Sequence, residues 1–405
     1  MTAPVQTENR LHPQNLRTLT LRSFLLGLRD NMVRAVWQPF VLSLGASMSL
    51  LGLLESIGGF GGIVSTAMLP LGGWLSDRHG RKRFLTVSNL LMMGGLAIYV
   101  LADRSRHWQW LLPGVVLVGL TAIARPAADS MTAESATPDA RGRAFGLVNT
   151  FYAISGVIAP AAGGFLASRY GFLSVLLLGL GVEAGTFVFS STLLRETLPS
   201  QGRQPAVAAD LIAMLRRSLT PPARLRAFYV AVTIDAFAFG MGTQIISGLL
   251  SKTYHFTPFQ LGLLASVGSV TWAIPQLFFG RKVDQHGCVP FLILSEFISV
   301  VVLTGWLLVR SFGAFLVLQT LWGVAVATWM PSFLSWITNS ISEGQRAEEL
   351  GRLGAFRGLL SFPAPYLGGL LFDAFGFRGP ILANLVGAVI VIVVMWLFVR
   401  EPEPA

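Results

Sequence analysis

Charged residues, cysteine and histidine are all scarce in this sequence, and each shortage excludes a class of protein. Only 12% of the 405 residues are charged, 53% are hydrophobic, and the mean hydropathy is +0.63. A typical water-soluble domain carries about 25% charged residues. We therefore expect most of the chain to lie in lipid.

Cysteine and histidine are too few for the chemistry that they often support. Cys288 is the single cysteine, which excludes an internal disulfide and a cysteine cluster for a metal. The glycine-rich G-x-x-x-x-G-K-[ST] loop that binds nucleotide phosphates is also missing. We expect no cofactor, no metal and no enzymatic activity, because the histidines fall in predicted loops or helix ends without a neighbouring nucleophile. These histidines are His12, His79, His107, His255 and His286.

Long apolar stretches dominate what is present. A membrane-spanning helix needs about 20 apolar residues, and the chain offers a dozen such stretches separated by polar, Gly or Pro residues. Strands are disfavoured, because the apolar residues do not alternate with polar ones. The first 17 residues contain no cleavable apolar leader, so we expect the first stretch to be retained. The predicted helices cover 18–44, 49–76, 83–102, 108–135, 143–168, 171–195, 225–250, 256–281, 288–309, 311–340, 348–373 and 377–400.

The distribution of positive charge predicts how the chain lies in the membrane. The formal net charge is +10, but Lys and Arg do not gather in one soluble domain, so we expect no nucleic-acid partner. Most of them fall on the side of the N-terminus, which predicts that both termini are cytoplasmic. We expect a monomeric, multi-pass, lipid-embedded protein of the bacterial inner (plasma) membrane.

An internal repeat divides the chain into two halves. Asp30 and Asp235 are 205 positions apart, and the same offset relates seven further pairs. These pairs are Pro126 and Pro331, Arg141 and Arg346, Gly146 and Gly351, Pro160 and Pro365, Gly163 and Gly368, Gly164 and Gly369, and Gly171 and Gly376. We predict an all-α integral membrane protein with twelve transmembrane helices in two pseudo-symmetric bundles. The predicted parts are an N-terminal segment (1–17), a first six-helix bundle (18–195), a linker (196–224), a second six-helix bundle (225–400) and a tail (401–405).

A glycine-rich basic motif follows the second predicted helix, and a weaker copy follows the eighth. The first reads Gly73-Trp-Leu-Ser-Asp77-Arg78-His-Gly80-Arg81-Lys82-Arg83, and the second keeps Gly280, Asp284 and Gly287 at an offset of 207. The first copy resembles the pattern G-x-L-x-D-R-x-G-R-K of the major facilitator superfamily, and the resemblance extends over nearly the whole chain. It implies two bundles of six helices with a substrate site near the middle of the bilayer.

The motif also has a direct physical interpretation. Gly73 allows another helix to approach closely, Gly80 permits a tight reversal, and Asp77 can pair with nearby cations or a helix N-terminus. One hypothesis is a cytoplasmic gate, which the resemblance also implies. The alternative is a basic loop that only fixes orientation. The candidate gate residues are Gly73, Asp77, Arg78, Gly80, Arg81, Lys82, Gly280, Asp284 and Gly287.

The fifth predicted helix carries small residues at helical spacing. Gly156, Pro160, Gly163 and Gly164 are similar to the G-x-x-x-G-P-x-x-G-G pattern of drug/proton antiporters in the same superfamily, although Ser155 and Ala159 replace its first two glycines. The resemblance implies export. Close helix packing explains the same residues equally well.

Charged residues inside the predicted spans are the candidates for mechanism, because a charge at bilayer depth is costly and usually faces a cavity or a partner. Asp30 and Arg34 share a face of the first helix, and Arg125 and Asp129 share a face of the fourth. A nearby arginine favours the charged form of Asp30 and dehydration disfavours it, so alternation between the two states could load and release a proton. The alternative is a permanent ion-pair network.

Further charges lie in the second half and on the second helix. Asp235 is the repeat partner of Asp30 and could carry a proton, bind a cationic substrate or form a structural hydrogen bond. Glu55 and Arg357 are secondary candidates. Glu183 and Glu296 are expected on peripheral helices, and the sequence suggests no role for them.

Aromatic residues suggest a lipophilic binding wall. Trp322, Trp329 and Trp336 recur every seven positions on the tenth predicted helix, with Gln319 near the first. Such a face suits an aromatic or cationic ligand, but ordinary packing explains it as well. Trp37, Trp272 and Gln276 could extend it.

Together these features predict a proton-coupled exporter of lipophilic or cationic small molecules. Uptake or facilitated transport of a polar metabolite, or transport of a lipid-like substrate, remains an alternative. A membrane sensor without transport activity would have nearly the same sequence features.

Overall fold

The computed structural model describes residues 13–59, 61–198, 220–341 and 346–402. This described part is helical and contains no strand. Ten of its helical stretches are long and apolar enough to cross a membrane. The first helix is long enough too, but it carries Arg22, Arg29, Asp30 and Arg34. Most of the predicted linker, residues 199–219, lies outside the described residues.

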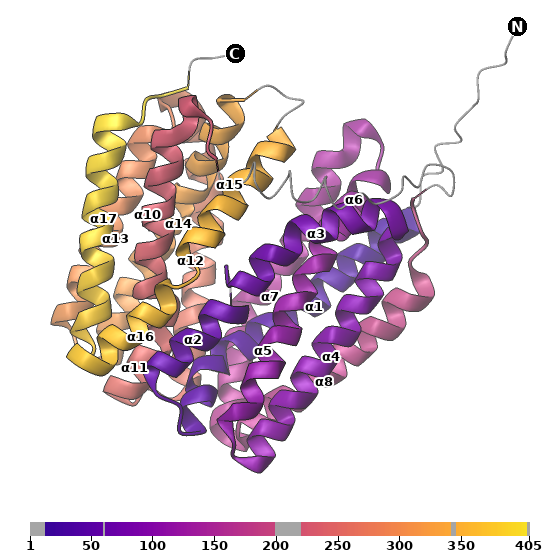
Figure 1. Ribbon diagram of the computed structural model, residues 1–405, viewed down its shortest axis with the longest axis horizontal. Helices are drawn as coiled ribbons and strands as arrows, with labels where there is room; N and C mark the ends of the chain where they lie inside the picture. The colour runs from indigo at the N-terminus through magenta and orange to yellow at the C-terminus, as the bar shows by residue number, and fades with distance from the viewer. Residues whose placement is uncertain (1–12, 60, 199–219, 342–345, 403–405) are drawn as a thin grey trace, which may run out of the picture.

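The first half comprises α1 to α8 (Figure 1). Its helices are α1 (Pro13–Ser43), α2 (Met48–Gly58), α3 (Ile63–His79), α4 (Arg81–Ser105), α5 (Leu111–Leu120), α6 (Arg125–Glu134), α7 (Arg141–Tyr170) and α8 (Phe172–Leu193). Short 3₁₀ turns lie at η1 (Trp108–Trp110), η2 (Thr121–Ala124) and η3 (Pro138–Ala140).

The second half comprises α10 to α17. Its helices are α10 (Arg226–Met241), α11 (Ile246–Tyr254), α12 (Pro258–His286), α13 (Val289–Leu308), α14 (Phe312–Asn339), α15 (Arg346–Ser361), α16 (Ala364–Phe375) and α17 (Arg378–Phe398). Its 3₁₀ turns are η4 (Ala223–Leu225) and η5 (Thr243–Ile245).

Four of the predicted helices are interrupted, and the local residues explain why. The predicted helix 49–76 breaks between α2 and α3, where Gly61 has a φ of +76°. The predicted helix 348–373 breaks at Pro363, which lacks the N–H that a continuous helix needs. The predicted helices 108–135 and 225–250 contain the 3₁₀ turns η2 and η5. The first helix begins at Pro13, earlier than the expected residue 18.

Two ends of the bundle differ in charge. We call one the basic end, because α3, α4, α7 and α10 begin or stop there with Arg81, Lys82, Arg141 and Arg226. The other, the far end, holds the turns after α1, α4 and α7. In Figure 1 the two halves touch toward the far end and lean apart toward the basic end.

The halves meet at two helix crossings whose glycines are related by the 205-residue repeat. On α7, a Cβ at Gly164 would lie 2.3 Å from the carbonyl oxygen of Pro258 on α12. On α16, a Cβ at Gly369 would lie 2.2 Å from the carbonyl oxygen of Met48 on α2. Since only glycine allows such an approach, the repeated glycines are among the closest contacts between the halves, together with Gly52 and Gly262 on the facing helices.

Candidate functional site

An ion-pair cluster lies inside the first half. Arg29 Nε is 3.2 Å from Asp30 Oδ1, and Arg29 Nη2 is 3.4 Å from Glu183 Oε2 on α8. Arg22, about two turns earlier on α1, donates a 3.2 Å hydrogen bond from Nη2 to Asn89 Oδ1 on α4. Arg29 and Glu183 are buried, whereas the Asp30 side chain is 38% exposed. Asp30 is therefore the member of the cluster that water can reach.

The other charges predicted on the first and fourth helices lie around one tyrosine. Asp30, Arg34 and Arg125 all act electrostatically on the hydroxyl of Tyr152 on α7. Arg125 and Asp129 also interact with each other on α6 and are exposed. The structure thus brings α1, α6 and α7 together at a charged surface.

An acid pair occupies the related place in the second half. Asp235 on α10 and Glu296 on α13 share a side-chain hydrogen bond, and the charge of Arg357 on α15 acts on Asp235. Glu296 is buried, and Asp235 is half-buried. Two carboxyl groups can share a hydrogen bond only if one of them holds a proton.

Glu55 lies apart from both clusters. It is buried on α2 and accepts a 3.1 Å hydrogen bond from Gln38 Nε2 on α1. Side-chain hydrogen bonds also join it to Trp37 and Gln244, and the second of these lies in the other half.

The tryptophans of α14 pack against different aromatic partners. Trp322 stacks on Phe239 with ring centroids 6.2 Å apart, and Trp329 lies parallel to Phe333 at 6.5 Å. The Arg357 guanidinium lies 5.8 Å from the centroid of the Phe333 ring. These contacts join aromatic residues of α10 and α14 to a cation of α15.

Trp336 does not belong to that aromatic wall. It is buried, its ring centroid is 3.8 Å from that of Phe228, and its Nε1 donates to the Arg400 carbonyl oxygen. The packing alternative therefore applies to this residue, because its ring packs into the core of the second half.

The remaining predicted wall residues are distributed over both halves. Trp37 packs on Tyr99 with centroids 4.7 Å apart. Gln319 packs against Gly268, and Gln276 is half-buried on α12. The Nε1 of Trp272 is buried and has no hydrogen-bond partner among the described residues.

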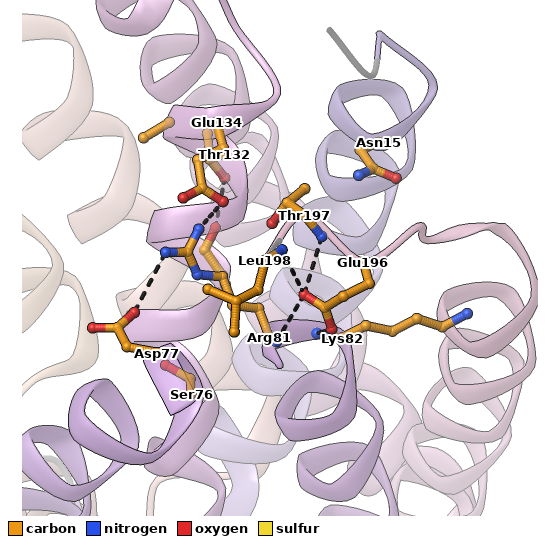
Figure 2. Close-up of polar contacts among 12 residues, drawn as sticks. Asn15, Ser76, Asp77, Arg81, Lys82, Thr132, Glu134, Glu196, Thr197 and Leu198 are labelled. Carbon is orange, nitrogen blue, oxygen red and sulfur yellow. Dashed lines mark hydrogen bonds and ion pairs between the residues drawn. The ribbon is translucent and has the colours of Figure 1, made fainter. Parts of the chain in front are cut away.

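The basic motif forms a charged cluster at the basic end (Figure 2). Arg81 Nη2 lies 3.4 Å from Asp77 Oδ1, and Arg81 Nη1 pairs with Glu134 at the end of α6. Arg78 covers the Trp74 ring at 4.5 Å and donates to the Trp74 carbonyl oxygen. Arg81 therefore connects the α3–α4 turn with α6 inside the first half.

Glu196 caps the start of α4 beside this cluster, as Figure 2 shows. Its carboxylate accepts from the main-chain N–H groups of Arg81 at 3.0 Å and Lys82 at 3.1 Å, and also from Thr197 and Leu198. Burial raises the pKa of Glu196, but these main-chain donors together hold the pKa below its usual 4.5. The positive end of the α4 dipole is thus matched by a fixed anion.

The second copy of the motif keeps the cap and loses the arginine. Gly80 and Gly287 have φ of +95° and +91°, as tight reversals require. Glu401 accepts from the N–H groups of Cys288 at 3.0 Å and Val289 at 2.6 Å, as Glu196 does from Arg81 and Lys82. Asp284 is exposed at the end of α12.

The close approach predicted at Gly73 occurs at its neighbour. A Cβ at Gly73 would lie 3.7 Å from Pro126, an ordinary contact, whereas one at Gly72 would lie 2.1 Å from the Ile123 carbonyl oxygen. That prediction was wrong by one position. A Cβ at Gly280 would meet no atom within 4 Å, so the second copy has no such contact.

The small residues of α7 mediate packing. A Cβ at Gly163 would lie 2.8 Å from the Met32 carbonyl oxygen on α1, and Gly164 faces α12. The Pro160 carbonyl oxygen would lie 2.2 Å from a Cβ at Gly262, while Gly156 has only ordinary contacts. These contacts favour the packing interpretation of the motif.

Sequence reasoning missed several partners in these clusters. Glu183 and Glu296 were expected to be peripheral, and Glu134 was not singled out. Glu196 and Glu401 were also missed, although both follow an arginine at the end of a half and stand 205 positions apart. The same offset that revealed the repeat could have found them.

Comparison with known sequences decides the family. The profile of the Major Facilitator Superfamily matches residues 19–249 and 228–405, which covers most of the sequence. The chain belongs to the major facilitator superfamily. It is a multi-pass integral protein of the inner membrane and a transporter rather than an enzyme, similar to the drug/proton antiporters of this superfamily.

Similar proteins have been named in several bacteria. The Multidrug resistance protein MdtG of Serratia proteamaculans (strain 568) is 25% identical over 376 residues, covering 90% of this chain and 89% of that protein. The protein of the same name from Klebsiella pneumoniae (strain 342) is 26% identical over 379 residues, covering 92% and 90%.

Solved structures share the fold. The human organic anion transporter MFSD10 (TETRAN) has a TM-score of 0.67 at 19% identity, covering 96% of this chain and 100% of that chain. A peptide transporter POT has a TM-score of 0.76 at 14% identity, covering 96% and 94%. At these identities the likeness concerns the fold alone.

Proposed function

We propose that this transporter exports lipophilic or cationic small molecules in exchange for protons, by alternating access of a site between its two halves. Its twelve spans would be arranged as six and six, with the basic end and both termini in the cytoplasm. The positive-inside rule supports this orientation, because Arg81, Lys82, Arg141 and Arg226 gather at the basic end. The name of the MdtG relatives supports the substrate class.

The observation that carries the proposal is the setting of Asp30. It is the water-accessible acid of an otherwise buried charge cluster, and it shares the surroundings of Tyr152 with Arg34 and Arg125. A carboxylate there can exchange a proton with water while its charge is balanced by Arg29. Movement of the halves would change the exposure of this carboxylate to water.

The aromatic residues supply the surface for the exported molecule. Trp329, Phe333 and Arg357 line one neighbourhood of the second half, close in the chain to the stacked Trp322. Flat aromatic faces bind lipophilic rings and cations. Asp235 offers a negative group on the neighbouring α10.

One observation favours the alternative of a polar or anionic metabolite. Arg34 and Arg125 are both exposed near Tyr152, and guanidinium groups suit carboxylate or phosphate groups. Such a substrate could be taken up or exported by the same transporter.

Flux in proteoliposomes tests both readings. Purified protein is challenged with lipophilic cations, neutral lipophiles and organic anions, each with and without an imposed pH gradient. We expect cation export that the gradient accelerates, and we expect Asp30→Asn to lose most of that acceleration. The control is Asp139→Asn, an exposed acid at the start of η3.

Three outcomes contradict parts of the proposal. Gradient-driven export that survives Asp30→Asn unchanged removes Asp30 as the coupling acid. Transport confined to anions favours the polar-metabolite alternative. No flux of any probe under any gradient favours a membrane sensor.

A further inference from the structure

A hydrogen-bonded seam joins the two halves near the far end. We define it by Gln38 on α1, Glu55 on α2, Gln244 in η5 and Gly248 on α11. Gln38 Nε2 donates to Glu55 Oε1 at 3.1 Å and to the Gln244 carbonyl oxygen at 2.7 Å, and its Oε1 accepts from Gly248 N–H at 2.7 Å. One amide therefore binds an acid of the first half and the backbone of the second half at once.

The hydrogen-bond partners of the acid in this seam are neutral groups. Glu55 is 7% exposed, and Trp37 and Gln244 hydrogen-bond to it in addition to Gln38. A Cβ at Gly59 would lie 2.2 Å from Glu55 Oε2, so only glycine leaves room for the carboxyl group there. A carboxyl group without water in such a place is far easier to keep neutral than charged.

Few other titratable groups act on Glu55. Arg34 on α1 and the Tyr99 hydroxyl on α4 interact with it electrostatically. Asp373 on α16 accepts from Ser49 N–H at the start of α2, and Lys252 lies near the end of α11. The sequence of α5, which also packs against α2, contains no titratable residue.

Opening at the far end must break this seam. Separation of α1 and α2 from η5 and α11 breaks the bonds of Gln38 to Gln244 and Gly248, and it brings water to Glu55. Water favours the charged carboxylate, whereas burial in the closed seam favours the neutral acid. Protonation and closure of the far end are therefore linked.

We propose that Glu55 is a proton-binding site built into the seam, and that its protonated form holds the two halves together at the far end. This proposal extends the proposed function, and its role in a transport cycle rests on the proposed exchange of substrate for protons. A proton taken up from the far side would close that side, which is the order that exchange of an outward-moving substrate for a proton requires.

Distances across the far end test the proposal without any substrate. Spin labels are placed at Ser43→Cys, at the end of α1, and Phe375→Cys, at the end of α16, in a Cys288→Ser background. A second pair, Gly142→Cys and Gln285→Cys, reports on the basic end, where both positions are exposed. Pulsed electron resonance then measures both distances in lipid nanodiscs between about pH 5.5 and 8.5.

We expect the far-end distance to be short at low pH and a longer population to grow as the pH rises. A single linked proton changes the ratio of the two states by up to about tenfold for each pH unit. The basic-end pair should move in the opposite sense.

Two variants of the seam should act in opposite directions. Glu55→Gln imitates the neutral acid and should keep the far-end distance short at every pH. Gln38→Ala removes the bonds to the second half and should increase the long-distance population at every pH. Asp103→Asn is the matched control, because Asp103 is a buried acid on α4 outside the seam, and its pH profile should follow the parent protein.

The proposal is overturned if the far-end distance does not depend on pH, or if Glu55→Gln keeps the parent pH profile. The proposal is also overturned if the pH dependence of the far-end distance is unchanged in Glu55→Gln but altered in Asp103→Asn, because the proton site would then lie outside the seam. Because the readout needs no flux, a pH response lost in Glu55→Gln supports the seam even where no transport is found. Export without this response would instead leave the proposed function standing and remove the seam.

Discussion

The two halves keep the same helices and glycines but differ in how they hold their buried acids. In the first half, Glu183 and Asp30 face Arg29, and the charge of Arg22 also acts on both acids, so two cations face two acids. In the second half, the positions 205 residues after Arg29 and Glu183 are Ile234 and Ala388. The repeated acid, Asp235, instead shares a hydrogen bond with Glu296.

This difference separates two kinds of buried acid. An acid held by an arginine can stay charged in a low-dielectric interior, and it depends on that partner for stability. Two acids that share a hydrogen bond depend on a proton instead. The first half therefore pairs its buried acids with cations, whereas the second half pairs two acids with each other through a hydrogen bond.

The largest expected effect comes from removing the buried acid of the first half. Glu183→Ala leaves the buried Arg29 without one of its two ion contacts, and the loss of one partner of a buried pair costs about 3–5 kcal/mol of unfolding free energy. Reversible unfolding in mixed detergent micelles measures this change.

Glu296→Gln is the matched change in the second half. An amide can keep a hydrogen bond to Asp235 without a proton, so we expect a loss below about 1 kcal/mol. Equal losses for the two variants would show that the distinction between the halves is mistaken. The double variant Arg29→Met with Glu183→Leu should recover much of the loss, since it removes both buried charges.

The next largest effect on unfolding free energy concerns the glutamate caps at the starts of α4 and α13, a feature that the two halves share. Glu196→Gln removes the anion at the start of α4, and loss of such a cap costs about 0.5–2 kcal/mol. The pKa of Glu196 lies below its usual 4.5 in the folded protein, so its stabilising effect is full above about pH 5 and is lost as the pH falls through the folded pKa. Unfolding free energies of the parent and the variant should therefore converge toward low pH.

Glu401→Gln makes the same change at α13, and it should also be destabilising at neutral pH. If the difference in unfolding free energy between the parent and Glu196→Gln persists unchanged at low pH, packing and not the carboxylate charge provides the stabilisation.

The sequence was sufficient for those features that depend on local pattern. Uninterrupted apolar stretches predicted helices, and the offset of 205 placed Gly164 and Gly369 at equivalent crossings. Helical spacing placed Asp30 and Arg34 on one face, but the ion contact of Asp30 is with its neighbour Arg29. Such features need no knowledge of how one helix is turned against another.

The partners of the buried charges depend on that rotation and were not predictable. Glu183 and Glu296 lie on helices that the sequence placed at the periphery, and only packing of α8 and α13 turns them inward. The close approach at Gly72 instead of Gly73 has the same origin, because one residue changes the facing direction by about 100°.

The smallest expected effect distinguishes the two motif copies through a single thiol. Cys288 stands where the first copy has Arg81, and burial, followed by the carboxylates of Glu401 and Asp284, raises its pKa from 9.0 to about 12. At neutral pH, the thiolate fraction of Cys288 should be on the order of a thousandfold smaller than that of an exposed cysteine. Alkylation of Cys288 should be slower by the same factor, because the thiolate is the form that reacts. Mass spectrometry after maleimide treatment measures the rate, with Ser43→Cys in a Cys288→Ser background as the exposed standard. Glu401→Gln should accelerate the reaction because it removes one of the two carboxylates. If Cys288 reacts as fast as the standard, the turn between α12 and α13 opens readily, and the two caps are not equivalent in strength.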